Sequence, residues 1–543
     1  MNAPVTGLTQ AADLSATGGV PGPGRIARVA IGDILRRAAK RFPERIALTD
    51  GPRRVTFTEL DRDANRFANY LISRGLKPGE KISTISNNSI EFVKALFGIH
   101  RAGLVWVPVN TMLAPQDMGY ILDHAEVRVA VIDDNLYAQA DRRAALEQRG
   151  IALVAVDLAG TAKTTGLPVF DDVIVGQSDI EPEVEFGDRD LAMIIYTSGT
   201  TSRPKGAMHG HLAVVMASMS NAVEMRLGRE SGISGQFPLF HCAAHVLLLS
   251  FLSVGGKMAI MRGFDPVACM EAIDREKLTN FVGLPMMYQM ILDHPRRGEF
   301  DFSSLKTCIY TMAPMSEPLM KRCIAELCRD FVLPSGQTEM YPATTMSQPD
   351  RQLARFGNYW GESMIVNETA IMDEEGNLLP PGQAGELVHR GPNVMLGYYK
   401  DPAATEEARR FGWHHTGDLA LIDEHGEVLF LDRKKDMIKS GGENVASIKI
   451  EETVLAYPAV MSAAVVGLPH PQWGEAVAAF VTLKPGAQAS EEEIVAHCRK
   501  TLGGFQIPKA AIILPAIPMT ATGKLRKVEL RQAYGDHFMK AGA

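Results

Sequence analysis

The sequence has few cysteines for its length, and none of them stands in a C-x-x-C pair. The chain of 543 residues has six, namely Cys242, Cys269, Cys308, Cys323, Cys328 and Cys498. Six cysteines would allow three disulfides, but their spacing matches no zinc or redox motif. Nothing in the sequence implies secretion, so we expect reduced thiols in a cytoplasmic protein.

Three further features are absent. The N-terminus lacks a basic segment followed by an apolar run, so the sequence predicts no signal peptide. The longest apolar stretch, around 246–254, contains serines and is too short for a bilayer, which predicts a buried core segment and no transmembrane helix. Basic residues are spread along the chain and the net charge is −7, so we expect no nucleic-acid partner.

The length exceeds what one hydrophobic core usually supports, so we expect at least two domains. Residues 1–25 are rich in Gly, Pro, Ala, Thr and Ser, and we predict that they are a disordered leader. From Ile31 the apolar residues follow helical spacing, and strand-like runs at 81–86, 104–109 and 127–132 alternate with helical segments. This alternation predicts an α/β fold with a parallel sheet.

The pattern changes in the second half of the chain. Segments 364–375 and 383–391 read as strands, and 419–431 reads as a hairpin, which predicts a small β-rich subdomain. A charged run at 432–436 then separates two apolar stretches, and beyond it predicted helices alternate with predicted strands. We therefore predict an N-terminal domain over 26–432 and a small α+β C-terminal domain over 433–543.

The most informative segment follows the apolar run Leu191–Ile195, which reads as a buried strand. It is rich in hydroxyls and glycine and ends in a Pro-Lys-Gly sequence. Backbone N–H groups, five hydroxyls and one ammonium group suit a loop that wraps a polyphosphate. The Walker pattern is absent, because no Ser or Thr follows the lysine. The segment consists of Thr197, Ser198, Gly199, Thr200, Thr201, Ser202, Arg203, Pro204, Lys205 and Gly206.

This segment resembles the signature T-S-G-T-T-G-x-P-K-G of the adenylate-forming superfamily, which includes acyl-CoA synthetases, peptide-synthetase adenylation domains and firefly luciferase. Ser202 stands where the signature has glycine. A second segment, Ser335-Gly336-Gln337-Thr338-Glu339, resembles Y-G-x-T-E of the same family. There the resemblance implies that Glu339 contacts Mg²⁺ and that Thr338 contacts phosphate. Ser335 replaces the tyrosine that stacks on adenine, and Met340 or Tyr341 is a candidate to compensate.

Other matches to the family follow in the same order along the chain. Trp413 to Asp418 resembles W-x-x-T-G-D and implies that Asp418 binds ribose, although a lone aspartate of this kind more often sits in a turn. Arg433 matches a family arginine that reaches ribose or phosphate, and Lys435 matches the hinge position. The resemblance covers the chain from about Ile31 to Lys527.

Two C-terminal segments carry further expectations from the resemblance. The loop Lys439-Ser440-Gly441-Gly442-Glu443 is implied to serve the second half-reaction and to bind CoA. Lys524, at the end of P-x-x-x-x-G-K, is implied to bridge the carboxylate and the α-phosphate.

The implied acyl pocket contains His241 and the segment Met312-Ala313-Pro314. Met286, Met287 and Trp360 also suggest bulky or adaptable pocket walls.

The resemblance implies an ATP-dependent acid:CoA ligase that forms AMP and pyrophosphate through an acyl-adenylate, with ATP, Mg²⁺ and CoA as cofactors. The C-terminal domain is expected to rotate about Lys435 between the half-reactions. We expect a short-chain, medium-chain or aryl carboxylic acid as the substrate, and a homodimer is plausible. Two alternatives stay open: an enzyme that hands the acyl group to a carrier protein, and a sensing protein with weakened catalysis. The first is less favoured because no carrier domain follows Lys524.

Overall fold

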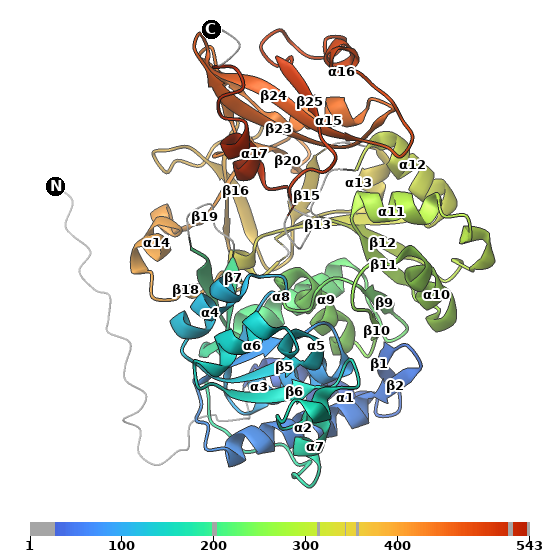
Figure 1. Cartoon of the computed structure of the whole chain (residues 1–543), viewed down its shortest axis with the longest axis vertical. Helices are drawn as coiled ribbons and strands as arrows, with labels where there is room; N and C mark the ends of the chain where they lie inside the picture. The colour runs from blue at the N-terminus through green and yellow to red at the C-terminus, as the bar shows by residue number, and fades with distance from the viewer. Residues whose placement is uncertain are drawn as a thin grey trace, which may run out of the picture.

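The computed structural model describes residues 28–197, 203–311, 315–342, 344–354, 358–519 and 525–539. The chain forms a large N-terminal domain and a small C-terminal domain, which is coloured orange to red at one end of the molecule (Figure 1). Within the described ranges, no helix is both long and apolar enough to cross a membrane. All six cysteines are described and buried, and their thiols are free.

The first sheet of the large domain has seven strands in the order β18-β8-β7-β4-β3-β5-β6. Five of them run parallel, and β8 pairs antiparallel to both β7 and β18. The predicted strands at 81–86, 104–109 and 127–132 are thus confirmed as neighbours in a largely parallel sheet. The bounds are β3 (Lys81–Ile85), β4 (Val105–Pro108), β5 (Val127–Asp133), β6 (Ala152–Val156), β7 (Leu191–Thr197), β8 (Lys205–Gly210) and β18 (Gly397–Tyr398).

The second sheet follows a continuous path of 13 strands, and its first half is mainly parallel. Here β1, β10, β9, β11, β12 and β13 pair parallel, and the edge strand β2 pairs antiparallel to β1. The bounds are β1 (Ile46–Asp50), β2 (Arg53–Thr56), β9 (Gly232–Gly235), β10 (Lys257–Ile260), β11 (Asn280–Gly283), β12 (Thr307–Tyr310) and β13 (Asp330–Ser335).

Five helices lie between the two sheets and form the main core. Side chains alternate between the two faces of strand β4, so Trp106 packs into this core while Val105 and Val107 pack on the opposite face of the sheet. Helix α2 begins at Phe57, where Thr56 and Glu59 form a reciprocal capping box. The apolar run at 246–254 lies in this layer, as predicted. The bounds are α1 (Ile31–Arg41), α2 (Phe57–Ser73), α3 (Ile90–Arg101), α8 (His211–Glu224) and α9 (Cys242–Ser253).

Shorter helices cover the outer faces of the two sheets, which gives alternating layers of helix and sheet (Figure 1). On the first sheet these are α4 (Pro115–His124), α5 (Asp134–Tyr137) and α6 (Ala140–Glu147), whereas α7 (Phe170–Ile174) packs against α2 and contributes Phe170 and Ile174 to the main core. On the second sheet they are α10 (Pro266–Glu276), α11 (Pro285–Leu292) and α12 (Glu317–Glu326). Single 3-10 turns are η2 (Ala162–Thr164), η3 (Arg297–Glu299), η4 (Thr338–Met340) and η5 (Arg410–Gly412).

The second half of the 13-strand path is an antiparallel lobe, which confirms the predicted β-rich subdomain. The predicted hairpin at 419–431 is formed by β19 and β20, which also bring the charged run to the end of the lobe. The bounds are β14 (Thr345–Ser347), β15 (Tyr359–Ser363), β16 (Glu368–Met372), β17 (Gly385–Arg390), β19 (His414–Ile422), β20 (Val428–Arg433), α13 (Pro349–Ala354) and α14 (Pro402–Glu407).

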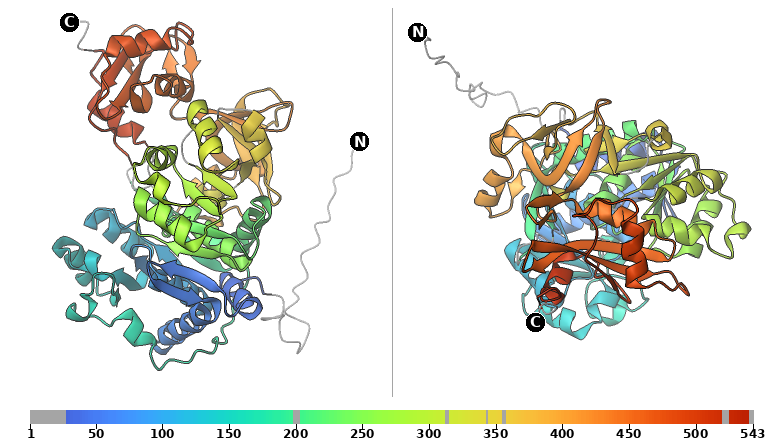
Figure 2. Two further views of the ribbon diagram at one scale, coloured as in Figure 1. Left: turned by 90° about the vertical axis from the view of Figure 1, so that its right-hand side faces the viewer. Right: turned by 90° about the horizontal axis from the view of Figure 1, so that it is seen from above.

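The C-terminal domain is built on a separate five-stranded sheet with its own apolar core (Figure 2). Strand β24 pairs with β21, β23 and β25, so helices and strands are mixed as expected for an α+β unit. The exact domain boundaries stay a prediction. The bounds are β21 (Ile438–Ser440), β22 (Glu443–Val445), β23 (Val460–His470), β24 (Gly474–Leu483), β25 (Ala510–Ile513), α15 (Ser447–Leu455), α16 (Glu491–Cys498) and α17 (Lys527–Ala533).

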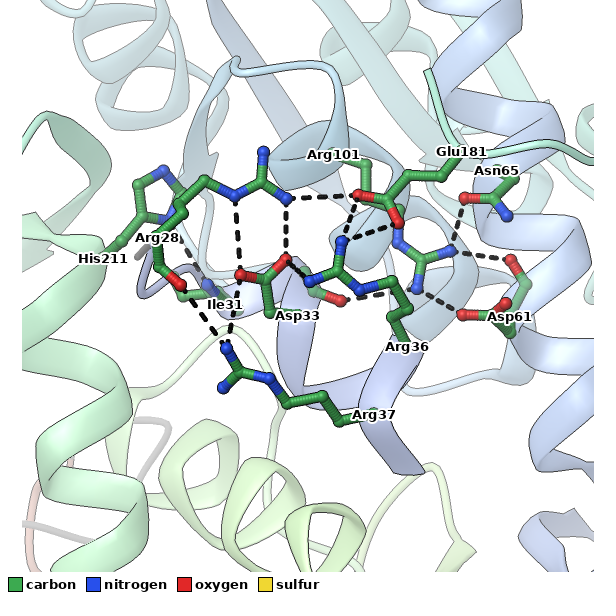
Figure 3. Close-up of polar contacts among 11 residues, drawn as sticks. Arg28, Ile31, Asp33, Arg36, Arg37, Asp61, Asn65, Arg101, Glu181 and His211 are labelled. Atoms are coloured by element: carbon green, nitrogen blue, oxygen red, sulfur yellow. Dashed lines mark hydrogen bonds and ion pairs between the residues drawn. The ribbon is translucent and has the colours of Figure 1, made fainter. Parts of the chain in front are cut away.

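A buried ionic network fixes the first helix to the rest of the large domain (Figure 3). The fully buried carboxylate of Asp33 lies 2.7 Å from the Arg28 guanidinium and 2.9 Å from that of Arg36. Both arginines also reach Glu181, each at 3.2 Å. Because each buried charge has an opposite partner, the network closes without an uncompensated ion.

Candidate active site

The proposed phosphate loop connects two adjacent strands at the end of the first sheet. Thr197 ends β7, Lys205 begins β8, and the two residues face each other in register. The Lys205 ammonium group lies 5.1 Å from the centre of the Tyr398 ring on β18, within cation–π distance. The remaining loop residues, Ser198 to Ser202, lie outside the described residues.

Tyr398 also connects this lysine to the second motif. Glu339 lies in the η4 turn that follows β13, and its Oε1 accepts a hydrogen bond of 3.0 Å from the Tyr398 hydroxyl. Burial and the neighbouring carboxylate raise the pKa of Tyr398, which keeps the hydroxyl a donor at neutral pH. The Oε2 atom of Glu339 has no partner among the described residues.

These donors fit a magnesium ion that is held mainly by substrate. Among the described residues, no group of three or more His, Cys, Asp or Glu side chains gathers to hold a metal. Mg²⁺ usually binds proteins through one or two carboxylates together with phosphate oxygens and water. One available carboxylate oxygen on Glu339 fits that mode of binding.

The structure brings Gln337, Asp418 and Arg433 together in one network. The buried Asp418 carboxylate lies 3.2 Å from the Arg433 guanidinium and 3.1 Å from the Gln337 amide nitrogen. The same nitrogen donates to the Thr416 carbonyl at 2.8 Å, and the Gln337 oxygen lies 3.2 Å from His414 Nε2. Asp418 and Arg433 face each other across the β19–β20 pair, so the sheet register sets their contact.

Glu386, which the sequence pattern predicts only as part of a strand, holds the turn before Asp418. Its buried carboxylate accepts from the Gly417 N–H at 2.9 Å and lies 3.1 Å from both His415 Nδ1 and Lys434 Nζ. Burial raises the pKa of Glu386, but these three donors outweigh it and the net shift is downward. One carboxylate thus connects the Asp418 turn to the segment that leads into the C-terminal domain.

A cavity of about 370 Å³ lies beside the start of α9, and His241 and Met287 line it together with Phe264. His241 caps α9 by accepting from the Ala243 N–H at 3.3 Å. The next residue, Cys242, has its sulfur 3.4 Å from the Thr338 hydroxyl. Cys242 does not line the cavity itself, but it stands between the lining residues His241 and Ala243, so this contact brings Thr338 close to the cavity wall.

Several predicted pocket residues have other positions. Trp360 is absent from the lining of this cavity and stacks instead on Phe430, with ring centres 4.1 Å apart. Met286 is also absent from the lining and is half exposed. The segment 312–314 lies outside the described residues.

The suggested replacements for the missing adenine platform are wrong. Met340 and Tyr341 are both fully buried, and the Tyr341 hydroxyl lies 2.6 Å from His245 Nδ1 in the core. Neither ring nor thioether is accessible to a base. Ser335 ends β13, and its carbonyl accepts from the Thr344 N–H at 2.7 Å, while its side chain is partly exposed.

The predicted hinge and CoA loop follow one another along the chain. Lys435 lies between β20 and β21, and the loop forms a tight hairpin between β21 and β22. Gly441 and Gly442 have φ of 62° and 89°, which suits a two-residue turn that L side chains rarely adopt. The Gly441 N–H donates to the Trp473 carbonyl at 2.9 Å, and Lys509 lies over the Trp473 ring.

Lys524 lies outside the described residues, but the residues on either side of the segment 520–524 are described. The adjacent residue, Leu525, pairs antiparallel with Met519. Met519 is the C-terminal domain's contribution to the lining of the His241 cavity. Met519 thus reaches the cavity, and Leu525 lies next to Met519 through this pairing without lining the cavity itself.

Family models of known proteins match most of the chain. The model of the AMP-binding enzyme family matches residues 35–399, and that of the AMP-binding enzyme C-terminal domain matches 449–524. The chain is 33% identical over 500 residues to feruloyl-CoA synthase of an Amycolatopsis species, covering 92% of this chain and 98% of that protein. It is 31% identical over 515 residues to 4-hydroxybutyrate–CoA ligase 2 of Metallosphaera sedula, covering 92% and 93%.

A solved structure gives the same picture. ATP-bound MatB from Rhodopseudomonas palustris superposes with a TM-score of 0.84 at 28% identity, covering 93% of this chain and 99% of that one. Both domains are therefore shared with proteins of this type. The chain belongs to the AMP-binding enzyme family, as an acyl-CoA synthetase of the adenylate-forming superfamily.

Proposed function

We propose that the chain activates a compact carboxylic acid with ATP and transfers the acyl group to CoA. The acid and ATP give acyl-AMP and pyrophosphate, and the CoA thiol then displaces AMP to give the acyl-CoA. The observation that carries this proposal is the contact between the Thr338 hydroxyl and Cys242, which stands in the chain between the cavity-lining residues His241 and Ala243. Thr338 is in turn the neighbour of Gln337, which contacts Asp418 beside Arg433.

In the first step an oxygen of the acid attacks the α-phosphorus, and the bond to pyrophosphate breaks. This reaction mainly requires alignment and neutralisation of charge on the phosphates. We assign alignment of the phosphates to the loop Thr197–Lys205 and alignment of the ribose to Asp418. Lys524 would meet the carboxylate and the α-phosphate, and the pairing of Met519 with Leu525 beside the cavity supports that role. Mg²⁺ at Glu339 would supply further neutralisation.

In the second step the sulfur of CoA attacks the acyl carbonyl carbon, and the bond to AMP breaks. We propose that rotation about Lys435 brings the Lys439–Glu443 hairpin to the site for this step. Trp473 supports the hairpin through its carbonyl, and its half-buried ring stacks on His470 with ring centres 4.2 Å apart and lies beside Lys509. The ammonium group of Lys509 suits the phosphates of CoA.

The dimensions of the cavity favour a short, medium-chain or aryl acid. At about 370 Å³ it lies near the lower end for small-ligand sites. Phe240, Phe264 and Met287 contribute aromatic and polarisable surface. The similarity to feruloyl-CoA synthase agrees with an aryl acid as one candidate.

A pyrophosphate-exchange assay over a panel of acids, with and without CoA, tests the proposal. We expect acid-dependent exchange in the wild type and AMP release that requires CoA. Lys524→Ala should abolish exchange yet retain thioester formation from supplied acyl-AMP, whereas the exposed control Lys500→Ala should retain both. Exchange without CoA turnover would indicate a carrier-protein acceptor, and no exchange with any acid would favour a sensing role.

A further inference from the structure

The turn that carries Thr338 and Glu339 ends in an unusual backbone conformation. Tyr341, the residue that follows the η4 turn, has φ of 35° and ψ of 90°. Residues other than glycine seldom adopt a positive φ, and those that do cluster at functional sites, where surrounding contacts hold them in place. Contacts around Tyr341 must therefore offset the cost of this conformation.

Helix α9 holds the Tyr341 side chain. Both Tyr341 and His245 are fully buried, and the Tyr341 hydroxyl lies 2.6 Å from His245 Nδ1. The His245 ring packs against Trp106 with ring centres 4.7 Å apart, and the Tyr341 ring packs against His209 at 5.5 Å. Water cannot replace either partner of this hydrogen bond, so removing one would leave the other buried and unsatisfied.

A different segment holds the backbone of the same turn. The Met395 N–H donates to the Glu339 carbonyl at 2.8 Å, and the buried Asn393 amide donates to the Met340 carbonyl at 2.7 Å. These two bonds fix the carbonyls in the second half of the turn. They do not reach the side chains at its two ends.

Helix α9 contacts the turn at both of those ends. Near the start of the helix, Cys242 Sγ lies 3.4 Å from the Thr338 hydroxyl, and His245 then contacts the Tyr341 hydroxyl. Cys242 and His245 stand at positions i and i+3, which lie on the same face of a helix. Glu339 stands in the chain between the two contact points, so α9 holds the turn on either side of this carboxylate.

We propose that His245 and Tyr341 are positioning residues that hold the turn of Thr338 and Glu339 in the orientation that meets the triphosphate. Both side chains are buried in the core, so they act through the backbone that joins Tyr341 to Glu339. This inference rests on the proposed function, which assigns Glu339 to the magnesium nucleotide. The hold of the Tyr341–His245 bond on the turn does not depend on that assignment.

Pyrophosphate exchange at varied ATP and at varied acid tests the proposal. Tyr341→Phe keeps the ring and removes the bond, so the KM for ATP should rise about fivefold while the KM for the acid changes by less than about twofold. The control Tyr137→Phe removes the hydroxyl of another buried tyrosine, which donates to Glu147 at 2.8 Å on the outer side of the first sheet. This control should leave both KM values unchanged.

A double variant separates positioning from stability. Tyr341→Phe leaves His245 Nδ1 without a partner, so the urea midpoint should fall. Adding His245→Leu removes that unpaired group and should restore much of the midpoint, because replacing both partners by apolar groups can be nearly neutral. The KM for ATP should stay raised in the double variant, since no hydrogen bond then holds Tyr341 at its positive φ.

Hydrogen exchange without substrate tests the bond independently of the ligase reaction. Peptides that cover 336–342 should exchange faster in Tyr341→Phe than in the wild type, whereas Tyr137→Phe should match the wild type there.

Three results would overturn the proposal: unchanged hydrogen exchange over 336–342 in Tyr341→Phe, a KM for ATP within about twofold of the wild type in that variant, or a KM that recovers together with the urea midpoint in the double variant. Loss of pyrophosphate exchange in every protein, the wild type included, would count against the ligase proposal. Faster hydrogen exchange in Tyr341→Phe would in that case still support the hold of this bond on the turn.

Discussion

Replacing Glu386 by glutamine should loosen the Asp418 turn and weaken ATP binding. The carboxylate receives three donors within 3.1 Å and its side chain is 8% exposed. Hydrogen bonds to buried charged groups stabilise by about 1.5–3 kcal/mol each, whereas the half-exposed Lys434 contributes no more than about 1 kcal/mol. In Glu386→Gln the side-chain oxygen would still accept one hydrogen bond. The new amide nitrogen is itself a donor and would face a second donor, which would lose its acceptor. The change should therefore lower local stability by about 2–4 kcal/mol.

The assay is pyrophosphate exchange at varied ATP. If about half of that loss is expressed at the nucleotide site, the KM for ATP should rise roughly tenfold, since 1.4 kcal/mol is a factor of ten. Glu375→Gln, a conservative change at an exposed turn of the same lobe, should leave the KM unchanged. An unchanged KM in Glu386→Gln would refute the link between this carboxylate and Asp418.

The lowered pKa of Glu386 gives the same experiment a pH dependence. A carboxyl group whose pKa falls on folding stabilises the protein fully above its ordinary value of 4.5. That stabilisation is lost as pH falls through the lower folded value. The stability difference between wild type and Glu386→Gln should therefore shrink below pH 4.5, as followed by the urea midpoint.

Three other predictions concern the nucleotide site, the first helix and the buried histidines. Asp418→Asn keeps the size but loses the charge pair with Arg433, so the KM for ATP should rise at least about tenfold; an unaltered KM would contradict the assignment. Asp33→Ala leaves the buried Arg28 with only Glu181 as its ionic partner, so the free energy of unfolding in urea should fall by about 3 kcal/mol. A change within about 0.5 kcal/mol, as for a surface substitution, would show that the Arg28–Asp33 pair contributes little. Burial holds the pKa of His209, His245 and His389 near 3, whereas unfolded imidazoles titrate at 6.5. Lowering the pH from 7.5 to 5.5 protonates the unfolded chain only, so the free energy of unfolding should fall by about 1.4 kcal/mol for each histidine, about 4 kcal/mol together. The melting temperature should therefore drop over that range, and a constant melting temperature would refute the prediction.

Much of the fold could be predicted because local pattern and tertiary position agree. The strands around Ile82, Trp106 and Val131 are apolar on both faces, as expected where helices cover both sides of a parallel sheet. The sequence does not show that one 13-strand path joins the second parallel sheet to the antiparallel lobe. That junction depends on β13 and β14, and it is a tertiary arrangement with no local signature.

The site could be predicted where short motifs carry chemistry, and less so where contacts come from distant segments. Gln337, Asp418 and Arg433 come from separate motifs and do meet. Tyr398 and Glu386 were missed as contacts because each lies in a strand whose pattern signals only burial. The error over Tyr341 has a similar cause, since a tyrosine next to a motif gives no indication of which way its ring is buried.

The position of Met519 has a consequence for the proposed binding of the acid. It comes from the C-terminal domain, yet it helps to enclose the cavity formed by the large domain. On the proposed function, the space offered to the acid is complete only while the two domains are docked as they are here. Chain-length preference should accordingly be set before activation, and engineering a longer acceptable acid would begin with a smaller residue at position 519.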